Sequence, residues 1–232
     1  IDRLASALER RGLGRGQSLV LMIKNRPECV ELGAAIARVG AAAVTISWRS
    51  TARELSYLVN HSGARGIVLE PELVPVLEEA RAELADAFLA NVFVVGPAGA
   101  VTTGSGVIAM TAIDSLLEEP TGPSPRAEAS EEDAAVVVYT SGTTGRPKGA
   151  VRKFPKDTMR AAFRFVNETP MRVDDVHLVA CPLYHSTAFA FLSLSHLLGA
   201  TAVIMDEFKP EPFLELVARH RVTTTAVVPT ML

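Results

Sequence analysis

The chain has 232 residues, 48% of them hydrophobic, and its 23 Lys and Arg residues against 26 Asp and Glu residues give a formal net charge of −3. A chain of this length can bury a substantial core, in one large domain or two smaller ones. Because charges of both signs are interspersed, the composition argues against a nucleic-acid-binding protein and against a polybasic membrane-surface segment, so we expect small-molecule partners.

The cysteine pattern and the apolar runs bear on the cellular compartment and on membrane insertion. Cys29 and Cys181 lie far apart, without the spacing of a zinc site or a disulfide framework, and this usage favours a reducing cytoplasm. The longest apolar runs are shorter than the ~18 residues of a membrane span, and residues 1–16 form an amphipathic helix pattern, unlike a signal peptide. We expect a cytoplasmic protein without a transmembrane segment, whose oligomeric state the sequence leaves open.

Helix and strand signals alternate along the chain. Pro27 begins a helix that Gly40 ends, and Thr51 with Glu54 forms the capping-box pattern of a helix that ends near Gly63. The expected helices cover residues up to 12, 27–39, 51–63, 72–87, 113–118, 156–168, 187–198 and 210–220. The expected strands cover residues 18–23, 41–46, 65–69, 91–95, 134–138, 176–180, 201–205 and 223–228.

This alternation predicts the fold class. Short apolar strands separated by helices of about 10 to 15 residues indicate an α/β protein with mostly parallel sheet covered by helices on both faces. The strands can form one large sheet or two α/β layers. In such folds ligands bind beyond the carboxyl ends of strands, where residues 139–149 and 182–186 are expected.

The stretch YTSGTTGRPKG, Tyr139–Gly149, follows the apolar strand 134–138. Backbone N–H groups of a glycine-rich turn can converge on one point, and the missing Cβ atoms let an anion approach closely. Further donors come from the side chains of Thr140, Ser141, Thr143, Thr144 and Lys148. The pattern predicts a polyphosphate site; the alternatives are a polar surface turn and a Lys148 that only caps it. The spacing differs from the Walker A pattern, because Lys148 is followed by Gly149, and this disfavours a P-loop ATPase.

The same stretch resembles the phosphate loop of adenylate-forming acyl-CoA synthetases and ligases, a superfamily that includes luciferases and the adenylation domains of peptide synthetases. Other segments resemble that family in order and spacing: LVLMIKNRPECVELGAAIARVGAAAVTIS, TARELSYLVNHSGARGIV, CPLYHSTAFAF and TTTAVVPTML. The resemblance implies two mostly parallel sheets with helices on both faces, as in the large N-terminal domain of the family. It implies one subdomain of about residues 26–184 and part of a second formed by about residues 1–25 and 185–232.

The resemblance also implies an activity and its cofactors. A carboxylic acid, expected to be a fatty acid, would react with ATP to form an acyl-AMP, and coenzyme A would then take the acyl group; Mg²⁺ assists. The nucleotide would contact Thr140, Ser141, Gly142, Thr143, Thr144, Gly145 and Lys148, with Lys148 and His185 as the catalytic residues. No metal ligand is expected within these residues, because the family's magnesium and ribose ligands and its C-terminal lid domain correspond to positions after residue 232. We therefore expect this stretch to be inactive by itself.

His185 follows Pro182 and Tyr184 in the segment that resembles the acyl site, where an imidazole can contact the acyl carboxylate or gate its pocket; the alternative is a structural histidine. Surface or helix-packing roles are expected for His61, His177, His196 and His220. A helix follows His185, and an acyl tunnel or the core is expected for its residues Phe189, Phe191, Leu192 and Leu194. Cys181 is expected in the core.

Two observations keep alternatives open. Arg152, Lys153 and Phe154 stand where the family has a hydroxyl residue and a histidine, and these positions are expected to begin the helix after the loop. The acceptor can also be a carrier protein, as for fatty acyl-AMP ligases. A noncatalytic nucleotide-binding module is the alternative outside the enzyme class.

Overall fold

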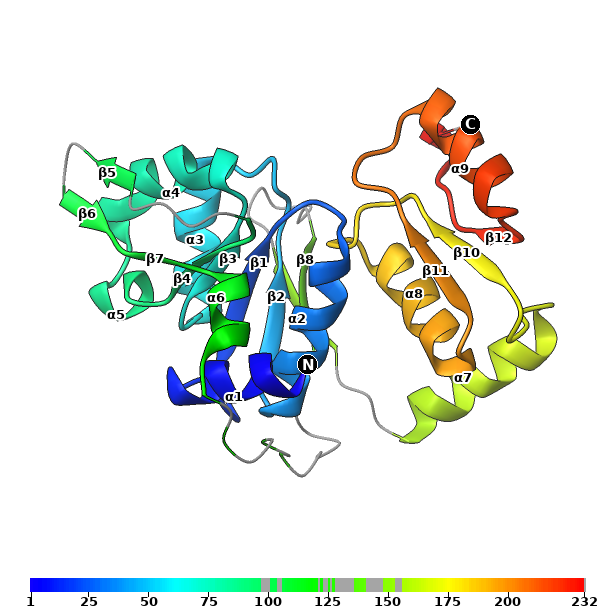
Figure 1. The fold of residues 1–232 in the computed structure, drawn as a ribbon, viewed down its shortest axis with the longest axis horizontal. Coiled ribbons are helices and arrows are strands. Elements are labelled where there is room, and N and C mark those ends of the chain that lie inside the picture. The colour runs from blue at the N-terminus through cyan, green and yellow to red at the C-terminus, as the bar shows by residue number, and fades with distance from the viewer. Residues whose placement is uncertain are drawn as a thin grey trace. The chain divides into compact units, whose positions relative to one another are not determined.

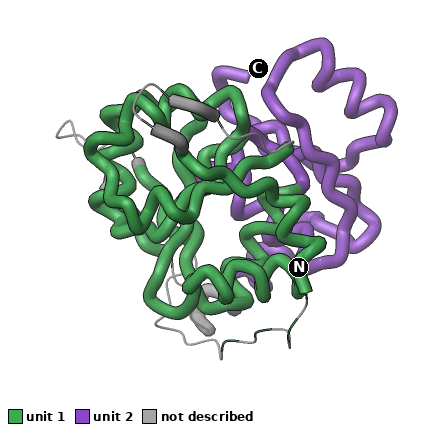
Figure 2. The backbone as a smooth tube through the Cα atoms, turned by 60° about the vertical axis from the view of Figure 1, so that its left-hand side comes forward, with its two compact units in different colours: residues 1–23, 28–153 green, residues 24–27, 154–232 purple. Residues whose placement is uncertain are grey.

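A computed structural model (Figure 1) describes residues 1–96, 101–103, 106–120, 122, 125, 127, 136–140, 148–152 and 156–231. The chain divides into two compact units, coloured separately in Figure 2. Unit 1 comprises residues 1–23 and 28–153, and unit 2 comprises residues 24–27 and 154–232.

Unit 1 is built on a seven-stranded sheet with the order β7-β4-β3-β1-β2-β8-β9. Every neighbouring pair in it is parallel except β8 and β9, which run antiparallel. The strands are β1 (Ser18–Met22), β2 (Ala42–Thr45), β3 (Ile67–Leu69), β4 (Val92–Val94), β7 (Met110–Ala112), β8 (Val136–Thr140) and β9 (Lys148–Arg152). A separate antiparallel pair is formed by β5 (Val101–Thr103) and β6 (Gly106–Ile108).

Both faces of this sheet are buried. Successive strand residues point to opposite faces, and every residue of β1, β3 and β4 is buried. Leu19 and Leu21 of β1 join one hydrophobic cluster, whereas Val20 and Met22 join another. The first cluster includes residues of α1 (Asp2–Arg10), α2 (Pro27–Arg38) and α6 (Ile113–Glu118). The second includes residues of α3 (Ala52–Ser62), α4 (Val74–Ala80) and α5 (Asp86–Leu89). Two 3₁₀ turns flank α4: η1 (Pro71–Leu73) and η2 (Arg81–Glu83).

The ends of α3 confirm the capping signals of the sequence. The Thr51 side chain accepts a hydrogen bond from the backbone N–H of Glu54, whose carboxylate accepts one from the Thr51 N–H at 2.8 Å. Gly63 ends the helix with φ of +61°, a conformation that glycine adopts without a steric penalty.

Unit 2 contains a smaller parallel sheet with the order β11-β10-β12. Its strands are β10 (Val176–Val179), β11 (Thr201–Ile204) and β12 (Thr224–Thr225). Its helices are α7 (Lys156–Glu168), α8 (Ser186–Leu198), α9 (Pro210–His220) and the 3₁₀ turn η3 (Pro229–Met231). Its core contains Leu178, Ala180 and Met205, against which apolar residues of α9 pack. The two parallel sheets confirm the predicted fold class.

The structure corrects the sequence analysis at several elements. The described residues contain four strands that were not predicted, β5, β6, β7 and β9. The helix expected over residues 72–87 is interrupted, because Leu84 takes an extended conformation and buries its side chain, and α5 begins after it. Arg152 was expected to begin a helix, yet it ends β9, where it pairs with Val136; Lys153 and Phe154 lie outside the described residues.

The compact units also divide the chain at positions other than the expected subdomain boundaries. Residues 1–23 belong with unit 1, because β1 pairs with both β2 and β3. Residues 154–184 belong with unit 2, because β10 pairs with β11 and β12. Strand pairing therefore places β1 and β10 in different units from those expected.

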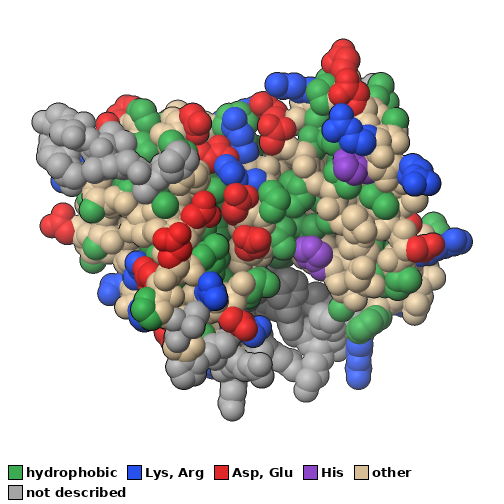
Figure 3. Space-filling model, in the orientation of Figure 1, with side chains coloured by type: hydrophobic (Ala, Val, Ile, Leu, Met, Phe, Trp, Pro, Cys, Tyr) green, Lys and Arg blue, Asp and Glu red, His purple; other side chains and the backbone are tan. Residues whose placement is uncertain are grey.

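The surface carries charges of both signs. On the face drawn in Figure 3, Lys and Arg side chains and Asp and Glu side chains both occur over both units, in line with the small net charge. None of the helices described above has both the length and the apolar character that crossing a bilayer requires.

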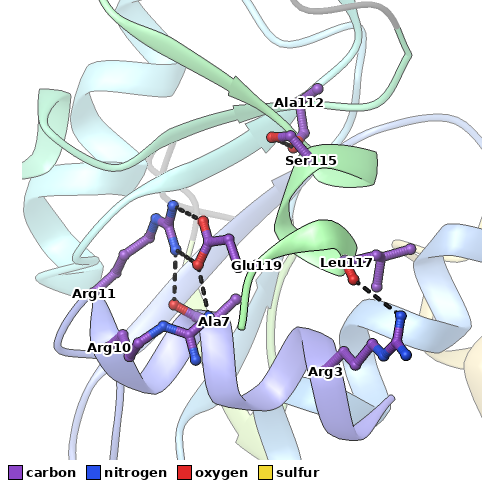
Figure 4. A network of polar contacts seen from close by, with 8 residues as sticks. All are labelled: Arg3, Ala7, Arg10, Arg11, Ala112, Ser115, Leu117 and Glu119. Atoms are coloured by element: carbon purple, nitrogen blue, oxygen red, sulfur yellow. Dashed lines mark hydrogen bonds and ion pairs between the residues drawn. The ribbon is translucent and has the colours of Figure 1, made fainter. Parts of the chain in front are cut away.

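A partly buried ion cluster fastens α1 to the end of α6 (Figure 4). Arg10 donates to Oε2 of Glu119 at 2.7 Å, and Arg11 donates to both carboxylate oxygens. The hydrogen bonds from Arg11 and Arg10 lower the pKa of Glu119 from 4.5 to about 2. Arg3 adds a bond from the same helix to the backbone carbonyl of Leu117 at 3.3 Å. The cluster thus adds polar contacts between α1 and α6, whose apolar residues share one hydrophobic cluster.

Candidate active site

The predicted phosphate loop begins at the carboxyl end of β8. Thr140 is the last residue of β8, Lys148 is the first of β9, and the two residues are paired across the antiparallel ladder. Because β8 is parallel to β2, this end of β8 lies at the same edge of the sheet as the carboxyl end of β2. Five predicted nucleotide-binding residues lie outside the described residues: Ser141, Gly142, Thr143, Thr144 and Gly145.

The hairpin below this loop has a close aromatic–glycine contact. Tyr139 is opposite Gly149, and a Cβ atom added at Gly149 would lie 3.2 and 3.3 Å from two atoms of the tyrosine ring and 3.3 Å from Cγ1 of Val137. These distances are shorter than a relaxed carbon–carbon contact of about 3.5 to 4.0 Å. Glycine at this position thus makes room for the Tyr139 ring next to the loop.

The hydroxyl of Tyr139 reaches α3. It shares a hydrogen bond of 2.8 Å with Nδ1 of His61, whose ring meets the tyrosine ring edge-on at a centroid distance of 5.7 Å. Burial raises the pKa of Tyr139, so its hydroxyl stays protonated at neutral pH. The sequence placed His61 on the surface, where it is exposed, but carried no signal for this bond, since the two residues are 78 positions apart.

Residues 182–186, the second segment predicted at a strand end, lie in unit 2 and connect β10 to the start of α8. The backbone N–H of His185 donates to the carbonyl of Pro182 at 2.9 Å, which closes a turn, and α8 begins at the next residue. His185 occupies the N-cap position without a side-chain capping bond, and it is exposed. Its ring lies against Tyr184 at a centroid distance of 4.6 Å. The imidazole is thus accessible to a solute.

A buried side chain that the sequence analysis did not single out holds this turn. Asn25, only 5% exposed, donates from Nδ2 to the carbonyl of Cys181 at 2.9 Å and accepts from the N–H of Leu183 at 2.7 Å. No short-range pattern could reveal these contacts, because they join residues 156 and 158 positions apart. Asn25 therefore fixes the backbone directly before His185.

The apolar residues of α8 differ in burial, and the expected acyl tunnel stays a prediction. Leu192 is buried in the core, whereas Phe189 and Leu194 are partly exposed. Phe191 stacks on His177 at a centroid distance of 6.0 Å and meets Phe165 edge-on. This aromatic cluster is a packing arrangement within unit 2.

Of the remaining histidines and Cys181, His177 and Cys181 are buried, and the other two are exposed. His177 is 1% exposed and lies 3.0 Å from Thr224 through Nδ1, and burial lowers its pKa. His196 and His220 are exposed in the last turns of their helices. Burial raises the pKa of Cys181, whose thiol donates to the carbonyl of Ala226 at 3.3 Å. Cys181 is therefore a protonated core residue at neutral pH.

Among the described residues, no group of three or more His, Cys, Asp and Glu side chains is placed to hold a metal ion.

Comparison with known proteins identifies the family. The model of the AMP-binding enzyme family matches residues 1–232. The chain is 30% identical over 236 residues to the long-chain-fatty-acid–CoA ligase FadD13 of Mycobacterium tuberculosis (strain ATCC 25618 / H37Rv), with 100% of this chain and 43% of that protein covered. It is also 30% identical over 234 residues to the fatty acid–[acyl-carrier-protein] ligase ScoC of Streptomyces coeruleorubidus, with 100% and 42% covered. The chain thus spans less than half the length of these relatives.

The fold agrees with this match. The inhibitor-bound N-terminal domain of FACL13 from Mycobacterium tuberculosis superimposes with a TM-score of 0.83 at 25% identity, covering 99% of this chain and 54% of that chain. Sequence and architecture therefore agree over the whole chain. The chain belongs to the AMP-binding enzyme family of adenylate-forming ligases.

Proposed function

We propose that the protein containing this chain activates a carboxylic acid with ATP, forming an acyl-AMP, and transfers the acyl group to the thiol of coenzyme A. The observation that carries the proposal is the uninterrupted sequence Tyr139–Gly149, which begins at the carboxyl end of β8, where Thr140 is paired with Lys148 of β9. Ligands of α/β sheets bind at such strand ends.

The chemistry assigned to this loop is control of phosphate charge. When the acid carboxylate attacks the α-phosphorus, the bond to the bridging oxygen breaks and pyrophosphate leaves with increasing negative charge. Phosphoryl transfer depends mainly on positioning and electrostatic stabilisation. In this proposal Lys148 and the hydroxyl groups of Thr140, Ser141, Thr143 and Thr144 contact the β and γ phosphates, and the backbone of Gly142 and Gly145 allows close approach. Mg²⁺ would accompany the nucleotide and reduce its charge.

The acid is assigned to unit 2. His185 is exposed at the start of α8, where an imidazole can contact a carboxylate. We propose a fatty acid, because Phe189 and Leu194 follow on the same helix with partly exposed apolar side chains and because FadD13 is named for a long-chain fatty acid. A carrier protein as acceptor is the second candidate, since ScoC shows the same identity.

Acid-dependent exchange of labelled pyrophosphate into ATP tests the proposal. The intact protein with MgCl₂ is assayed with short, medium and long fatty acids and with aromatic acids. Exchange that needs an acid, strongest with a fatty acid, is expected. Coenzyme A or a phosphopantetheinylated carrier protein is then added, and the thioester formed identifies the acceptor. ATP binding by calorimetry without exchange for any acid would instead support a noncatalytic nucleotide-binding module.

A further inference from the structure

The side-chain amide of Asn25 hydrogen-bonds to the backbone just after β10, as a neighbouring strand would. The β10 ladder continues as far as Val179, whose carbonyl accepts from the N–H of Met205 at 3.1 Å. Beyond it, the carbonyl of Cys181 and the N–H of Leu183 are bonded by one primary amide, which supplies one donor and one acceptor as a peptide group does.

Both hydrogen bonds are buried, and this raises the energetic cost of losing either one. Asn25, Cys181 and Leu183 are 5%, 3% and 8% exposed, so water cannot easily replace the amide. Removing one partner of a buried hydrogen bond leaves the other group unsatisfied. The backbone at Leu183 is therefore held by a side chain from residues 24–27, the short segment that belongs to unit 2 although β1 precedes it in unit 1.

The clamp lies immediately before the exposed imidazole. Leu183 is two residues from His185, and the turn that His185 closes begins at Pro182, between the two clamped residues. A shift of the Cys181–Leu183 backbone would therefore move the N-cap position of α8 and the ring of His185. Misplacement of a contacting group by about 1 Å can cost a factor of about a hundred in rate.

We propose that Asn25 is a positioning residue for the acid site: its amide fixes the Cys181–His185 turn so that His185 meets the substrate carboxylate. This proposal rests on the proposed function. Asparagine suits the task because it carries both a donor and an acceptor, whereas aspartate lacks the donor and would set a carboxylate against the carbonyl of Cys181.

The test compares Asn25→Ala and Asn25→Asp with Asn91→Ala in the intact protein. Asn91 is a matched control, 9% exposed in unit 1, whose Nδ2 donates to the carbonyl of Arg65 at 3.2 Å. One readout is amide hydrogen exchange at Leu183. The other is acid-dependent pyrophosphate exchange, with KM measured separately for the acid and for ATP.

Asn25→Ala should accelerate exchange at Leu183 by about tenfold or more, because it removes the acceptor of that N–H. Both variants should raise KM for the acid by about tenfold or more, with KM for ATP within about twofold of wild type, since Asn25→Asp keeps this acceptor and loses the donor to Cys181. Asn91→Ala should change neither Leu183 exchange nor KM for the acid. In the wild type, the Leu183 amide should exchange slowly although it lies outside any helix or strand, a measurement that needs no variant.

Fast exchange at Leu183 in the wild type would overturn the proposal. So would an unchanged KM for the acid in Asn25 variants that expose Leu183, or an equal rise of both KM values. A wild type that adenylates no acid would refute the proposed function itself, and this result appears before any variant is made.

Discussion

Replacing Gly149 by alanine should weaken the hairpin that carries the predicted phosphate loop. The new Cβ would lie 3.2 Å from a ring atom of Tyr139 and 3.3 Å from Cγ1 of Val137, so the ring must move by a few tenths of an ångström. Overpacking of this kind costs about 1 to 3 kcal/mol, and the smaller backbone entropy of alanine offsets about 0.5 to 1 kcal/mol. A net loss of about 0.5 to 2 kcal/mol in local stability follows.

Gly33 in α2 provides a control with the same chemical change. A Cβ atom at Gly33 meets no atom within 4 Å, and the residue lies inside a helix, so alanine there should stabilise α2 by about 0.5 to 1 kcal/mol. The two substitutions are therefore expected to act with opposite signs.

Native-state hydrogen exchange measures both effects locally, in β8 and β9 for Gly149→Ala and in α2 for Gly33→Ala. The opening free energy should fall in the hairpin and rise in the helix. If Gly149→Ala slows exchange in β8 and β9, the contact between Tyr139 and Gly149 does not limit this position. A loss of stability in α2 would show that the assumed open space at Gly33 is wrong.

Two further predictions concern stability and pH. Glu119→Gln should lower the unfolding free energy at pH 7 by about 1 to 2 kcal/mol, a value reduced for the partial exposure of the cluster. Because the folded-state pKa of Glu119 is lowered from 4.5 to about 2, its contribution is present above pH 4.5 and is lost as the pH falls toward 2, so urea unfolding of wild type and variant should converge there. Burial lowers the pKa of His177, opposed by the nearby Asp175, so stability is full above pH 6.5 and falls on acidification, by at most about 1.4 kcal/mol per pH unit. His177→Phe should flatten the dependence of the unfolding free energy on pH below about 6.5; an unchanged slope would show that another group is responsible.

The sequence predicted those elements whose signals are local. Thr51, Glu54 and Gly63 define both ends of α3 through contacts within one helix, and the apolar runs located all strands that are buried on two faces. The strand β9 was missed because Lys148–Arg152 contains two charged residues and a glycine. It forms a strand because β8 lies beside it in register.

The candidate site likewise combines residues that a local sequence pattern reveals with residues that lie far away in the sequence. The motif located Thr140 at the end of β8 and Lys148 beside it at the start of β9, since glycines and hydroxyl residues after an apolar strand form a local pattern. The side chains that support the two segments come from distant positions: His61 reaches Tyr139, and Asn25 reaches Cys181 and Leu183. Neither carries a residue-type signal, because a histidine on an amphipathic helix and an asparagine in a connection are common in any α/β protein.

Single-turnover kinetics of a Lys148→Ala variant of the intact protein test the central claim most directly. Lys209→Ala is the control, since Lys209 is an exposed lysine before α9. Acyl-AMP formation and thioester formation from supplied acyl-AMP are timed separately. If the loop acts on departing pyrophosphate, Lys148→Ala slows acyl-AMP formation by a factor of about 10 to 1,000 and changes thioester formation much less, whereas Lys209→Ala changes neither. Equal impairment of both steps by Lys148→Ala would contradict the account.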